Sequence, residues 1–515
     1  MRKCELRPSS TSKLSIAVGL ALSAGAASGQ TAIPVTSAAD TGPGTLRQAF
    51  IDADASAGPD SIDMSAISGS TITLAADLPE VAGDLQISGS DVTLDGNGQA
   101  CLRVTGYLEV ADMTITNCNN PESSPYVGGR GGAISANGLF LENSTITGNT
   151  AGRSGGGVFS GGYSANIVDS VISNNSARFG GGVRAVYSLA IIDSTITGNS
   201  AETDGGGFFV SAGYGSEFTM ENSSITGNTA GRDGGGGYAY SGPDRYGISI
   251  VNSTISSNSA GREGGGLKLS SRNTLIADVE IGLTNSTVTT NTAATGGGIF
   301  SYNGSRYDVD VTFSIIGGTI AFNESTASEG GGVHVVNEAD PDVSYMFFNI
   351  DNSIIQGNIA PGSGADVAAG APTTPGSTNL TFNVNYTVLG EAPVGPAVFN
   401  PDGATSGAIG SDAELGPLAD NGGPTLTHLP GVGSLAREFI PDGVNGCGAT
   451  FDRDQRGESR PLGPACDAGS VEQRLSLPPV VPVPTMTRWG AGVLGLGLAL
   501  MGWLGFRRRT MAARE

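Results

Sequence analysis

The sequence predicts an all-β protein whose middle part winds as a right-handed parallel β-helix, a solenoid of short strands. Three observations predict this fold. A seven-residue phrase occurs eight times between residues 143 and 358, always with Asn in its last position. Three consecutive Gly follow seven of the copies. Between these markers apolar and polar residues alternate over short stretches, which is the period of a strand and not of a helix.

The spacing of the phrase sets the expected geometry. Its first copy reads Asn143-Ser-Thr-Ile-Thr-Gly-Asn149, and successive copies start 24 to 35 residues apart. About 24 residues with roughly three strands make one turn of a solenoid, whose turns stack ~4.8 Å apart. Parallel crossovers are nearly always right-handed, so we expect that hand.

The last Asn of each copy is predicted to form a column along the solenoid. Asn tolerates the left-handed backbone conformation of a corner, and its amide can both donate to and accept from the Asn one turn away. We interpret these residues as a structural ladder and not as ligands. Its members are Asn149, Asn175, Asn199, Asn228, Asn258, Asn291, Asn323 and Asn358.

The Gly triplets are predicted to let the backbone turn tightly and approach neighbouring turns. No helix follows them, so they do not match a phosphate-binding loop. They comprise residues 155–157, 180–182, 205–207, 235–237, 264–266, 296–298 and 330–332.

The segment 30–100 is predicted to hold an N-terminal cap and the first coils. Thr45-Leu-Arg-Gln48 fits a helix-capping box, and Leu46, Ala49, Phe50 and Ala53 share one helical face. A helix over residues 45–56 would cover the otherwise open first coil. The β-helix is expected over 101–395, a small C-terminal module over 396–477, and a Pro-rich linker over 478–488.

Both ends of the chain have the pattern of targeting segments. Residues 1–29 begin with basic residues and continue with an apolar run, as a secretory signal peptide does. The segment from Trp489 to Phe506 has no charge and precedes Arg507, Arg508 and Arg509. These features predict a transmembrane helix over 489–506 and a basic cytoplasmic tail over 507–515.

The net charge of the part predicted to be exported argues against one class of binding partner. Without residues 1–29 and 478–515, the chain has 17 basic and 46 acidic residues, a net charge of −29. A polyanion of this strength repels nucleic acid.

The cysteines fit an oxidising compartment. Cys4 belongs to the signal peptide, and the other four form two local couples. We expect the disulfides Cys101–Cys118 and Cys447–Cys466, because these are the shortest closures. A metal site is the weaker alternative, since the chain has no CxxC motif and only two His.

The repeat phrase and the Gly triplets make residues 100–395 resemble the secreted bacterial right-handed β-helix repeat proteins. Leu415-Gly-Pro-Leu-Ala-Asp-Asn-Gly-Gly-Pro-Thr425, Asp454-Gln-Arg-Gly457 and Cys466-Asp-Ala-Gly469 resemble the choice-of-anchor Q domain. Val483-Pro-Thr-Met486 with Trp489 and the following apolar span resembles an IPTL-CTERM sorting signal, with Val in place of Ile and Met in place of Leu.

The sorting resemblance implies a place in the cell. It implies processing near Pro484 and Thr485 by an exosortase-like membrane protease, and delivery to the envelope surface of a Gram-negative bacterium. A plain membrane anchor through the C-terminal helix is the alternative.

Three carboxylates are candidate metal ligands. Asp204, Asp233 and Glu263 each lie five residues after a ladder Asn, so adjacent turns would bring them ~5 Å apart. That spacing suits a retaining glycosidase pair or a calcium site, and calcium is the only cofactor considered. The favoured interpretation is a solvated edge, where Arg232 and Arg262 neutralise the carboxylates.

Tyr residues gather where the repeat units lengthen, between a Gly triplet and the next copy of the phrase. Loops at a shared phase should project from one edge of the solenoid, and Tyr suits contact with sugars or protein partners. Stacking of the rings into cross-turn ladders is the alternative. The candidate ligand-binding residues are Tyr163, Tyr187, Tyr214, Tyr240, Tyr246, Tyr302 and Tyr307, and Tyr238 and Tyr345 lie at the same phase.

No catalytic residue is predicted. His428 and Asp454-Gln-Arg-Gly457 share the C-terminal module, but no nucleophile elbow or HExxH motif accompanies them, so we expect a structural Asp–Arg pair near the Cys447–Cys466 bridge. The predicted function is non-enzymatic adhesion or binding of glycan or matrix at the cell surface. A polysaccharide lyase or glycoside hydrolase acting on acidic polysaccharide is the alternative, although Lys268 is the only Lys after the signal peptide.

Overall fold

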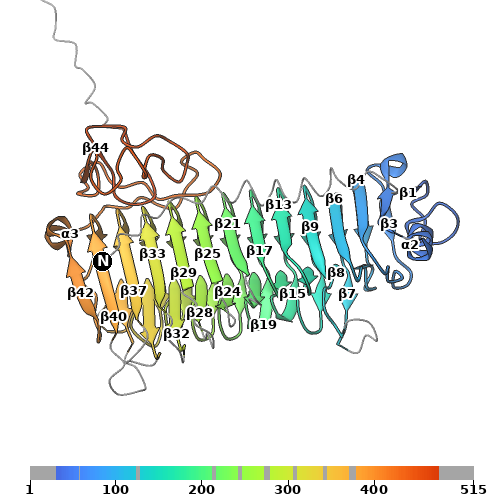
Figure 1. Ribbon diagram of the computed structural model, residues 1–515, viewed down its shortest axis with the longest axis horizontal. Coiled ribbons are helices and arrows are strands. Elements are labelled where there is room, and N and C mark those ends of the chain that lie inside the picture. The colour runs from blue at the N-terminus through green and yellow to red at the C-terminus, as the bar shows by residue number, and fades with distance from the viewer. Residues whose placement is uncertain are drawn as a thin grey trace, which may run out of the picture. The chain divides into compact units, whose positions relative to one another are not determined.

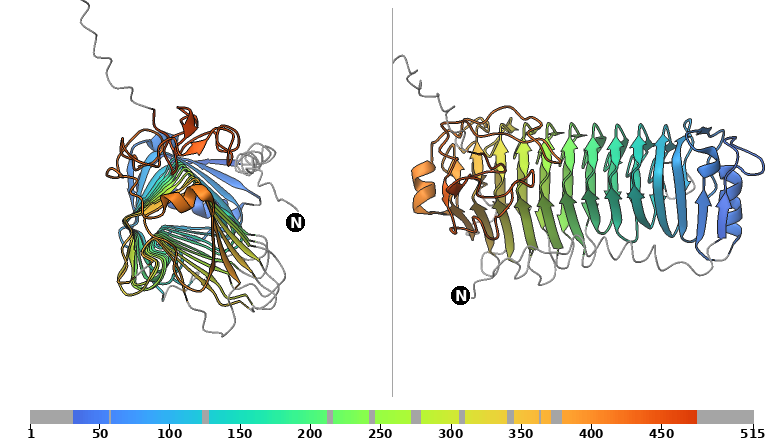
Figure 2. Two further views of the ribbon diagram at one scale, coloured as in Figure 1. Left: turned by 90° about the vertical axis from the view of Figure 1, so that its left-hand side faces the viewer. Right: turned by 90° about the horizontal axis from the view of Figure 1, so that it is seen from above.

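The computed structural model describes residues 31–56, 58–122, 128–211, 216–241, 246–271, 279–305, 310–339, 345–362, 364–370 and 379–474. The chain divides into two compact units, residues 1–473 and residues 474–515, and the first unit contains all of the helices and strands described. This unit is an all-β solenoid in which consecutive turns lie side by side along one axis (Figures 1 and 2). All strand pairs between turns are parallel, and they form three long sheets of 24, 8 and 10 strands. The all-β prediction with long parallel sheets is confirmed.

The largest sheet receives two strands from most turns, on either side of a kink. Its strands are β1 (Thr31–Pro34), β2 (Asp60–Asp63), β3 (Thr71–Thr73), β4 (Leu85–Asp95), β6 (Tyr107–Thr116), β9 (Gly138–Glu142), β10 (Thr145–Thr147), β13 (Ala165–Val168), β14 (Val171–Ser173), β17 (Leu189–Ile192), β18 (Thr195–Thr197), β21 (Glu217–Glu221), β22 (Ser224–Thr226), β25 (Tyr246–Val251), β26 (Thr254–Ser256), β29 (Val279–Thr284), β30 (Thr287–Thr289), β33 (Val311–Ile316), β34 (Thr319–Ala321), β37 (Met346–Asp351), β38 (Ile354–Gln356), β40 (Leu380–Asn385), β41 (Val388–Leu389) and β42 (Val398–Pro401).

Two further sheets complete each turn. The eight-stranded sheet holds β7 (Asn119–Asn120), β11 (Thr150–Ala151), β15 (Ser176–Phe179), β19 (Ser200–Asp204), β23 (Thr229–Ala230), β27 (Ser259–Ala260), β31 (Thr292–Ala293) and β35 (Glu324–Ser325). The ten-stranded sheet holds β5 (Leu102–Arg103), β8 (Ile134–Ala136), β12 (Val158–Ser160), β16 (Val183–Ala185), β20 (Phe208–Ser211), β24 (Gly237–Ser241), β28 (Leu267–Ser271), β32 (Ile299–Asn303), β36 (Val333–Asn337) and β39 (Val367–Ala369). A full turn therefore has four short strands where the sequence predicts about three.

Apolar side chains from all three sheets fill the interior. The Ile at the fourth position of the phrase stacks on its equivalents, with Ile146 paired to Ile172 and Ile172 to Ile196. These residues are fully buried, and so is Val288, which takes the place of Ile in its turn. Burying one such side chain contributes about 1.5–3 kcal/mol, so the column is a main source of stability.

The ladder Asn form a continuous hydrogen-bonded column, as the repeat predicts. In each case the side-chain Nδ2 donates to the Oδ1 of the Asn on the next turn, at 2.9 or 3.0 Å. The column starts at the backbone N–H of Cys118, which donates to Asn149, and ends at the carboxylate of Asp366, which accepts from Asn358 at 2.8 Å.

The left-handed residue of the corner is not the ladder Asn. It is the residue just before it, and it is Gly148 in the first copy, with φ +67°. A second left-handed position is the first residue of the phrase, for example Asn143 with φ +43°, which produces the kink in the largest sheet. The prediction that the ladder Asn adopts this conformation is therefore wrong, because its side chain turns inward to reach the next amide.

A second polar ladder was not predicted. The Ser at the second position of the phrase accepts from the backbone N–H of the equivalent residue one turn earlier, for example Ser170 Oγ from Ser144 at 3.1 Å. The contact recurs from Ser170 to Ser194 and from Ser194 to Ser223, both at 3.0 Å. It satisfies backbone donors that the kink removes from the sheet.

The predicted capping helix is α2 (Leu46–Ala55), which lies at the N-terminal end of the solenoid (Figure 1). The hydroxyl of Thr45 accepts from the Gln48 N–H, as in a capping box, whereas the Gln48 side chain donates to Asp52 instead of completing the box. The apolar face predicted for this helix is buried. At the other end, α3 (Gly403–Ala408) follows β42, the last strand of the largest sheet.

The predicted disulfides are both present. Cys101 and Cys118 are joined with their Cα atoms 5.8 Å apart, and Cys447 and Cys466 with theirs 5.9 Å apart. The first disulfide fixes the corner where the Asn ladder begins.

The C-terminal module, with the two-stranded sheet of β43 (Ile440–Pro441) and β44 (Ala465–Cys466), packs along the last turns (Figure 1). Gln455 is fully buried there, and its side chain accepts from Thr287 at 2.7 Å and donates to Thr254 at 2.9 Å. Asp454 and Arg456 form a 2.8 Å ion pair, the structural Asp–Arg pair that the sequence predicts. The two predicted targeting segments, 1–29 and 489–506, lie outside the described residues. Among the described residues, no helix is long and apolar enough to cross a membrane.

Candidate functional site

The outer face of the ten-stranded sheet carries a column of aromatic and cationic side chains. Strand register places one such residue directly over the next on seven consecutive turns. In order these are Phe159, Arg184, Phe209, Tyr238, Lys268, Phe300 and His334. Two cations, Arg184 and Lys268, stand among five rings. From Arg184 to His334 each side chain packs on its neighbour.

The contacts within the column are close. The Arg184 guanidinium lies 4.3 Å from the ring centre of Phe209, which stacks on Tyr238 at 5.0 Å with an interplanar angle of 2°. The Lys268 Nζ lies 5.1 Å from the Tyr238 ring and 5.5 Å from the Phe300 ring. Such cation–π contacts contribute about 0.5–1 kcal/mol each when exposed and more when desolvated.

The Gly triplets position this column. The first Gly of each triplet is left-handed, and the second residue after the triplet faces outward on the new strand. In the fourth unit the register pairs Gly237 with Phe208, so the triplet there is 234–236 and not the predicted 235–237. A Cβ on Gly237 would lie 2.0 Å from the Phe208 ring, so this Gly leaves room for that ring in the core.

A second column runs beside the first, at the corner between the eight-stranded and ten-stranded sheets. Bridges on successive turns align its members, which are Arg130, Ser154, Phe179, Asp204, Asp233, Glu263 and Thr295. The two columns touch where Phe179 meets Phe209, at 6.2 Å between ring centres, and where Lys268 meets Asp233, at 2.8 Å. We call the surface made by these two columns the gutter.

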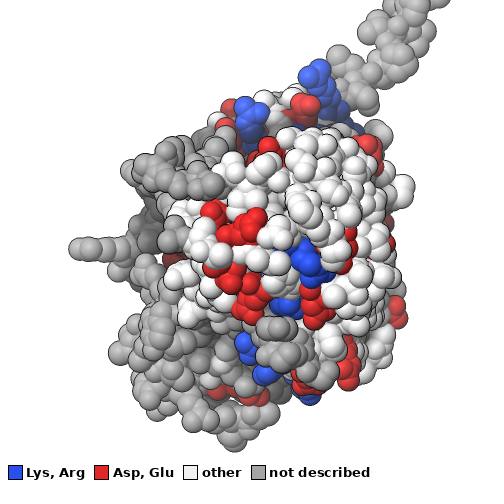
Figure 3. Space-filling model, turned by 90° about the vertical axis from the view of Figure 1, so that its right-hand side faces the viewer, with Lys and Arg blue, Asp and Glu red and all other residues white. Residues whose placement is uncertain are grey.

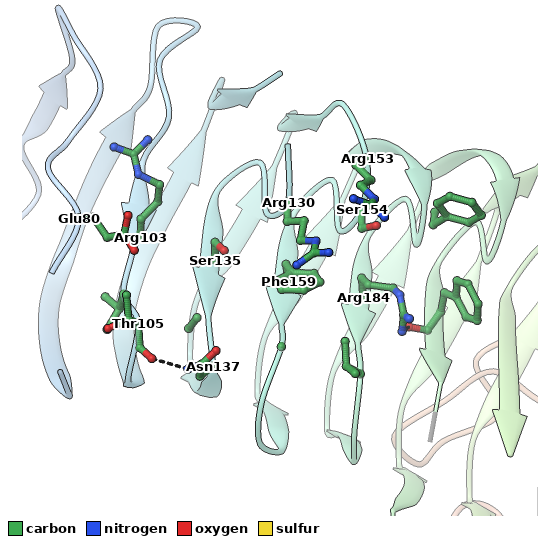
Figure 4. Close-up of a pocket in the computed structure, with 16 residues that line it drawn as sticks. Glu80, Arg103, Thr105, Arg130, Ser135, Asn137, Arg153, Ser154, Phe159 and Arg184 are labelled. Atoms are coloured by element: carbon green, nitrogen blue, oxygen red, sulfur yellow. Dashed lines mark hydrogen bonds between the residues drawn. The ribbon is translucent and has the colours of Figure 1, made fainter. Parts of the chain in front are cut away.

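The N-terminal end of the gutter is a cavity of about 610 Å³ with a cationic lining (Figure 4). Four arginines line it, Arg103, Arg130, Arg153 and Arg184, with Glu80 as its single carboxylate. The Arg130 guanidinium lies 5.2 Å from the ring centre of Phe159. This cationic lining contrasts with the N-terminal end face of the molecule, where acidic side chains predominate (Figure 3).

Arg184 is half-buried at the edge of this cavity. Burial, with a smaller contribution from the charge of Arg130, lowers the pKa of Arg184 to about 10. Its guanidinium donates to Ser211 Oγ at 2.7 Å and to the Phe209 carbonyl at 3.2 Å. Both acceptors are neutral, so the hydrogen bonds orient the group without balancing its charge.

The middle of the gutter is charge-compensated. Arg232 Nε donates to Asp204 and Arg262 Nε donates to Asp233, each at 2.8 Å and each one turn back along the solenoid. Lys268 bridges Asp233 and Glu263. Burial raises the pKa of Asp233, but the hydrogen bonds from Arg262 and Lys268 outweigh that effect and leave it below the usual value.

The three predicted metal-ligand candidates therefore align on adjacent turns but serve another purpose. Asp204, Asp233 and Glu263 all contact Arg or Lys, as the neutralised edge favoured from the sequence requires. That edge was expected to be solvated, whereas Asp204 is 3% and Asp233 is 1% exposed. Among the described residues no group of three or more His, Cys, Asp or Glu side chains is arranged to hold a metal ion.

The C-terminal end of the gutter is a second cavity, of about 510 Å³, lined by polar residues. The Tyr302 hydroxyl donates to Glu338 at 2.8 Å, and His334 Nδ1 lies 3.1 Å from the Glu329 carbonyl. Burial lowers the pKa of His334, so this imidazole is neutral at pH 7. It stacks on Phe300 at 5.5 Å.

Only some of the Tyr residues predicted to bind a ligand lie near one another in the structure. Tyr240 and Tyr302 lie at equivalent positions of the ten-stranded sheet, two turns apart, next to the gutter. Tyr163 is 63% exposed and Tyr187 is half-buried. Tyr246 begins strand β25, and its side chain, like Tyr214 and Tyr307, lies outside the described residues. The ring stack of Tyr238 on Phe209 matches the alternative prediction of cross-turn ladders.

Sequence reasoning missed the first column of the gutter. The signal was available, because its members follow the Gly triplets by two residues on seven turns. These positions share no residue type, so a search for a repeated residue does not find them. Compared with protein-family models, with curated proteins and with solved structures, the chain matches none of them.

Proposed function

We propose that this chain is an exported protein of the bacterial envelope surface that binds extended glycans along the gutter without cleaving them. The observation that carries the proposal is the column of stacked rings and cations on the outer face of the ten-stranded sheet. Aromatic faces pack against sugar rings, and cations beside them add polar contacts.

The periodicity of the column supports a polymeric ligand. The same backbone position recurs on seven consecutive turns, so the surface places aromatic or cationic side chains at a regular interval. Extended surfaces of this kind are how solenoid proteins bind long partners. We take the winding as right-handed, as nearly all parallel crossovers are.

The chain ends and the cysteines support the proposal of export and sorting. Two disulfides suit an oxidising compartment outside the cytoplasm. We propose that an exosortase-like protease processes the chain near Pro484 and Thr485 after the 489–506 helix has inserted in the membrane. Finding Trp489 to Phe506 still attached in the intact mass of the mature surface form would contradict this step.

The enzymatic alternative draws on the middle of the gutter, where Lys268 stands among carboxylates. A lyase requires a cationic base that can release its proton, and a retaining glycosidase requires a carboxyl pair of which one is protonated. Lys268 is held between Asp233 and Glu263, and Asp233 has a lowered pKa. These contacts favour binding over turnover.

A binding and cleavage screen separates the two functions. The full chain, purified in detergent, is incubated with a panel of glycans, and bound glycan is measured together with unsaturated products and new reducing ends. We expect binding without products. Formation of either product would favour the enzymatic alternative.

A paired substitution ties binding to the gutter. Phe209→Leu with Tyr238→Leu keeps apolar volume and removes two stacked rings, so we expect glycan affinity to fall. Phe347→Leu is the matched control, because Phe347 also stacks on an aromatic neighbour, Tyr345, but on strand β37 of another sheet. Unchanged affinity in the double variant would exclude the gutter as the binding surface.

A further inference from the structure

We propose that the N-terminal cavity of the gutter is a binding site for carboxylate or sulfate groups, so that the glycan bound by this protein is acidic. The inference rests on the proposed function for the identity of the polymer, but the anion site itself stands on the geometry of three arginines, Arg130, Arg153 and Arg184.

The first step is a repeated Arg position. Arginines precede the corner column on four turns, at Arg153, Arg178, Arg232 and Arg262. Arg232 and Arg262 reach back one turn and meet the corner carboxylates Asp204 and Asp233.

The other two arginines have different corner residues on the preceding turn. One turn before Arg178 the corner residue is Ser154, and one turn before Arg153 it is Arg130. The Arg position before the corner recurs on these turns, but the N-terminal turns lack the corner carboxylate that the middle turns supply.

The second step is the state of the guanidinium groups. Within the described parts of the chain, Arg130, Arg153 and Arg184 form no ion pair. The Arg184 side chain is held against the Phe209 ring and donates to neutral acceptors. Its lowered pKa, caused by burial and by Arg130, reflects a site that an anion would stabilise.

The third step is the space available. The cavity of about 610 Å³ lies within the range of about 300–1,000 Å³ typical of small-molecule sites. Arg130 and Arg153 border it on adjacent turns, and the Phe159 ring lies beside Arg130 (Figure 4). The forked donors of Arg130 and Arg153 can together hold a carboxylate or a sulfate here.

The charge of the rest of the chain sharpens the selectivity. The exported body has a net charge of −29, so most of the surface repels an acidic polymer. An anion is therefore directed to the cavity, where Arg130, Arg153 and Arg184 form no ion pair with a described residue. Its binding should weaken as salt is added.

Titration calorimetry on the full chain in detergent tests the proposal. The probes are inorganic sulfate, polygalacturonate with its neutral methyl ester, and sulfated dextran with unsulfated dextran. We expect each acidic polymer to bind at least about tenfold more tightly than its neutral counterpart, because charge-assisted hydrogen bonds are lost with the charge. The two acidic polymers distinguish a carboxylate source from a sulfate source.

The variants Arg130→Gln and Arg153→Gln, combined, remove two of the cations. Neither side chain donates a hydrogen bond to another described residue, so the fold should be retained, which a thermal melt verifies. We expect a loss of about tenfold or more in affinity for the acidic polymers and for sulfate. Arg453→Gln, an exposed residue of the C-terminal module, is the matched control for charge and should change affinity by less than about twofold.

The outcomes separate this inference from the proposed function. Equal binding of acidic and neutral polymers, unaffected by the double variant, would overturn the anion site and leave glycan binding in place. Sulfate binding that the double variant abolishes, without binding of any polymer, would support the anion site and overturn the proposed function. Binding of no probe at all would overturn both.

Discussion

Two stretches of the gutter use the same backbone positions for opposite purposes. In the middle stretch, Asp233 at the corner accepts from Arg262 and from Lys268, each on the following turn. In the N-terminal stretch, Ser154 occupies the equivalent corner position, and Arg178 and Arg184 occupy the positions of the two cations. A single corner residue thus decides whether the surrounding cations find a carboxylate partner within the described residues.

The interior of the two stretches is the same. The Asn ladder bond is 2.9 Å from Asn149 to Asn175 and 3.0 Å from Asn228 to Asn258, and the Ile column continues through both. Because the Asn and Ile columns of the interior stabilise the stacking of the turns in both stretches, the residues of the outer columns can differ from turn to turn. The difference teaches that a solenoid can keep the residues of its interior constant while the residues of its outer face vary.

The largest effect is expected from breaking what the two stretches share. Asn228 donates to Asn258 and to the Ile196 carbonyl and accepts from Asn199, all buried. Asn228→Ala leaves these groups without partners and should lower the free energy of unfolding by about 3 kcal/mol, measured by denaturant titration. Asn400→Ala, on an exposed side chain, is the control and should cost less than about 0.5 kcal/mol. Equal losses in the two variants would show that the ladder is not a main source of stability.

The next effect comes from converting one stretch into the other. Ser154→Asp places a carboxylate where Asp233 stands in the middle stretch, within reach of Arg178 and Arg184. Corner carboxylates are tolerated when buried, since Asp204 is 3% and Asp233 is 1% exposed. We expect affinity for inorganic sulfate to fall about tenfold or more, measured by calorimetry, while the melting temperature is retained.

A control for added charge is Ser68→Asp, at an exposed position near the N-terminal cap. It should leave sulfate affinity within about twofold. Loss of binding in both variants would mean that net charge, and not the corner position, determines anion binding.

A smaller effect separates the two stretches by pH. Arg262→Gln removes a hydrogen bond that holds the pKa of Asp233 below its usual value. A lowered folded pKa adds stability above the unfolded pKa, and that stability disappears as the pH falls through the folded pKa. We therefore expect a loss of about 1 kcal/mol at pH 7 that shrinks at pH 3, measured as the free energy of unfolding.

Arg153→Gln is the counterpart in the N-terminal stretch. Arg153 forms no ion pair with the described residues, so its replacement should cost little at either pH. A pH-dependent loss of the same size in both variants would contradict the difference between the stretches.

The smallest effect is expected outside the gutter. Tyr163, one of the sequence-predicted ligand residues, is 63% exposed. Tyr163→Ser should change stability by less than about 0.5 kcal/mol and leave glycan affinity unchanged. Reduced affinity with unchanged stability would extend the binding surface beyond the two columns.

The interior could be predicted from the sequence and the gutter could not. The Asn and Ile columns repeat one residue type because every turn imposes the same interior environment. The outer column holds a different residue on nearly every turn, from Phe159 to His334, so no repeated letter reveals it. The corner carboxylates were found by spacing, but the reach of Arg262 to the preceding turn depends on the corner geometry, which spacing alone does not give.

The backbone details show a second limit of the sequence. The ladder Asn was expected to be left-handed, whereas Gly148 and its equivalents have that conformation. The equivalents include Ser257, Thr290 and Phe322, so residue type alone does not mark the left-handed position. The inward turn of the Asn side chain decides it.

The Asn ladder has a beginning and an end of different chemistry. It opens on the Cys118 amide, which can only donate, and closes on the Asp366 carboxylate, which accepts the last amide. Every Asn between them accepts a hydrogen bond from the turn before and donates one to the turn after, so the ladder has a direction. Whole turns can be inserted or deleted between these two terminators without redesigning either, which gives evolution a way to adjust the reach of the molecule in steps of one coil.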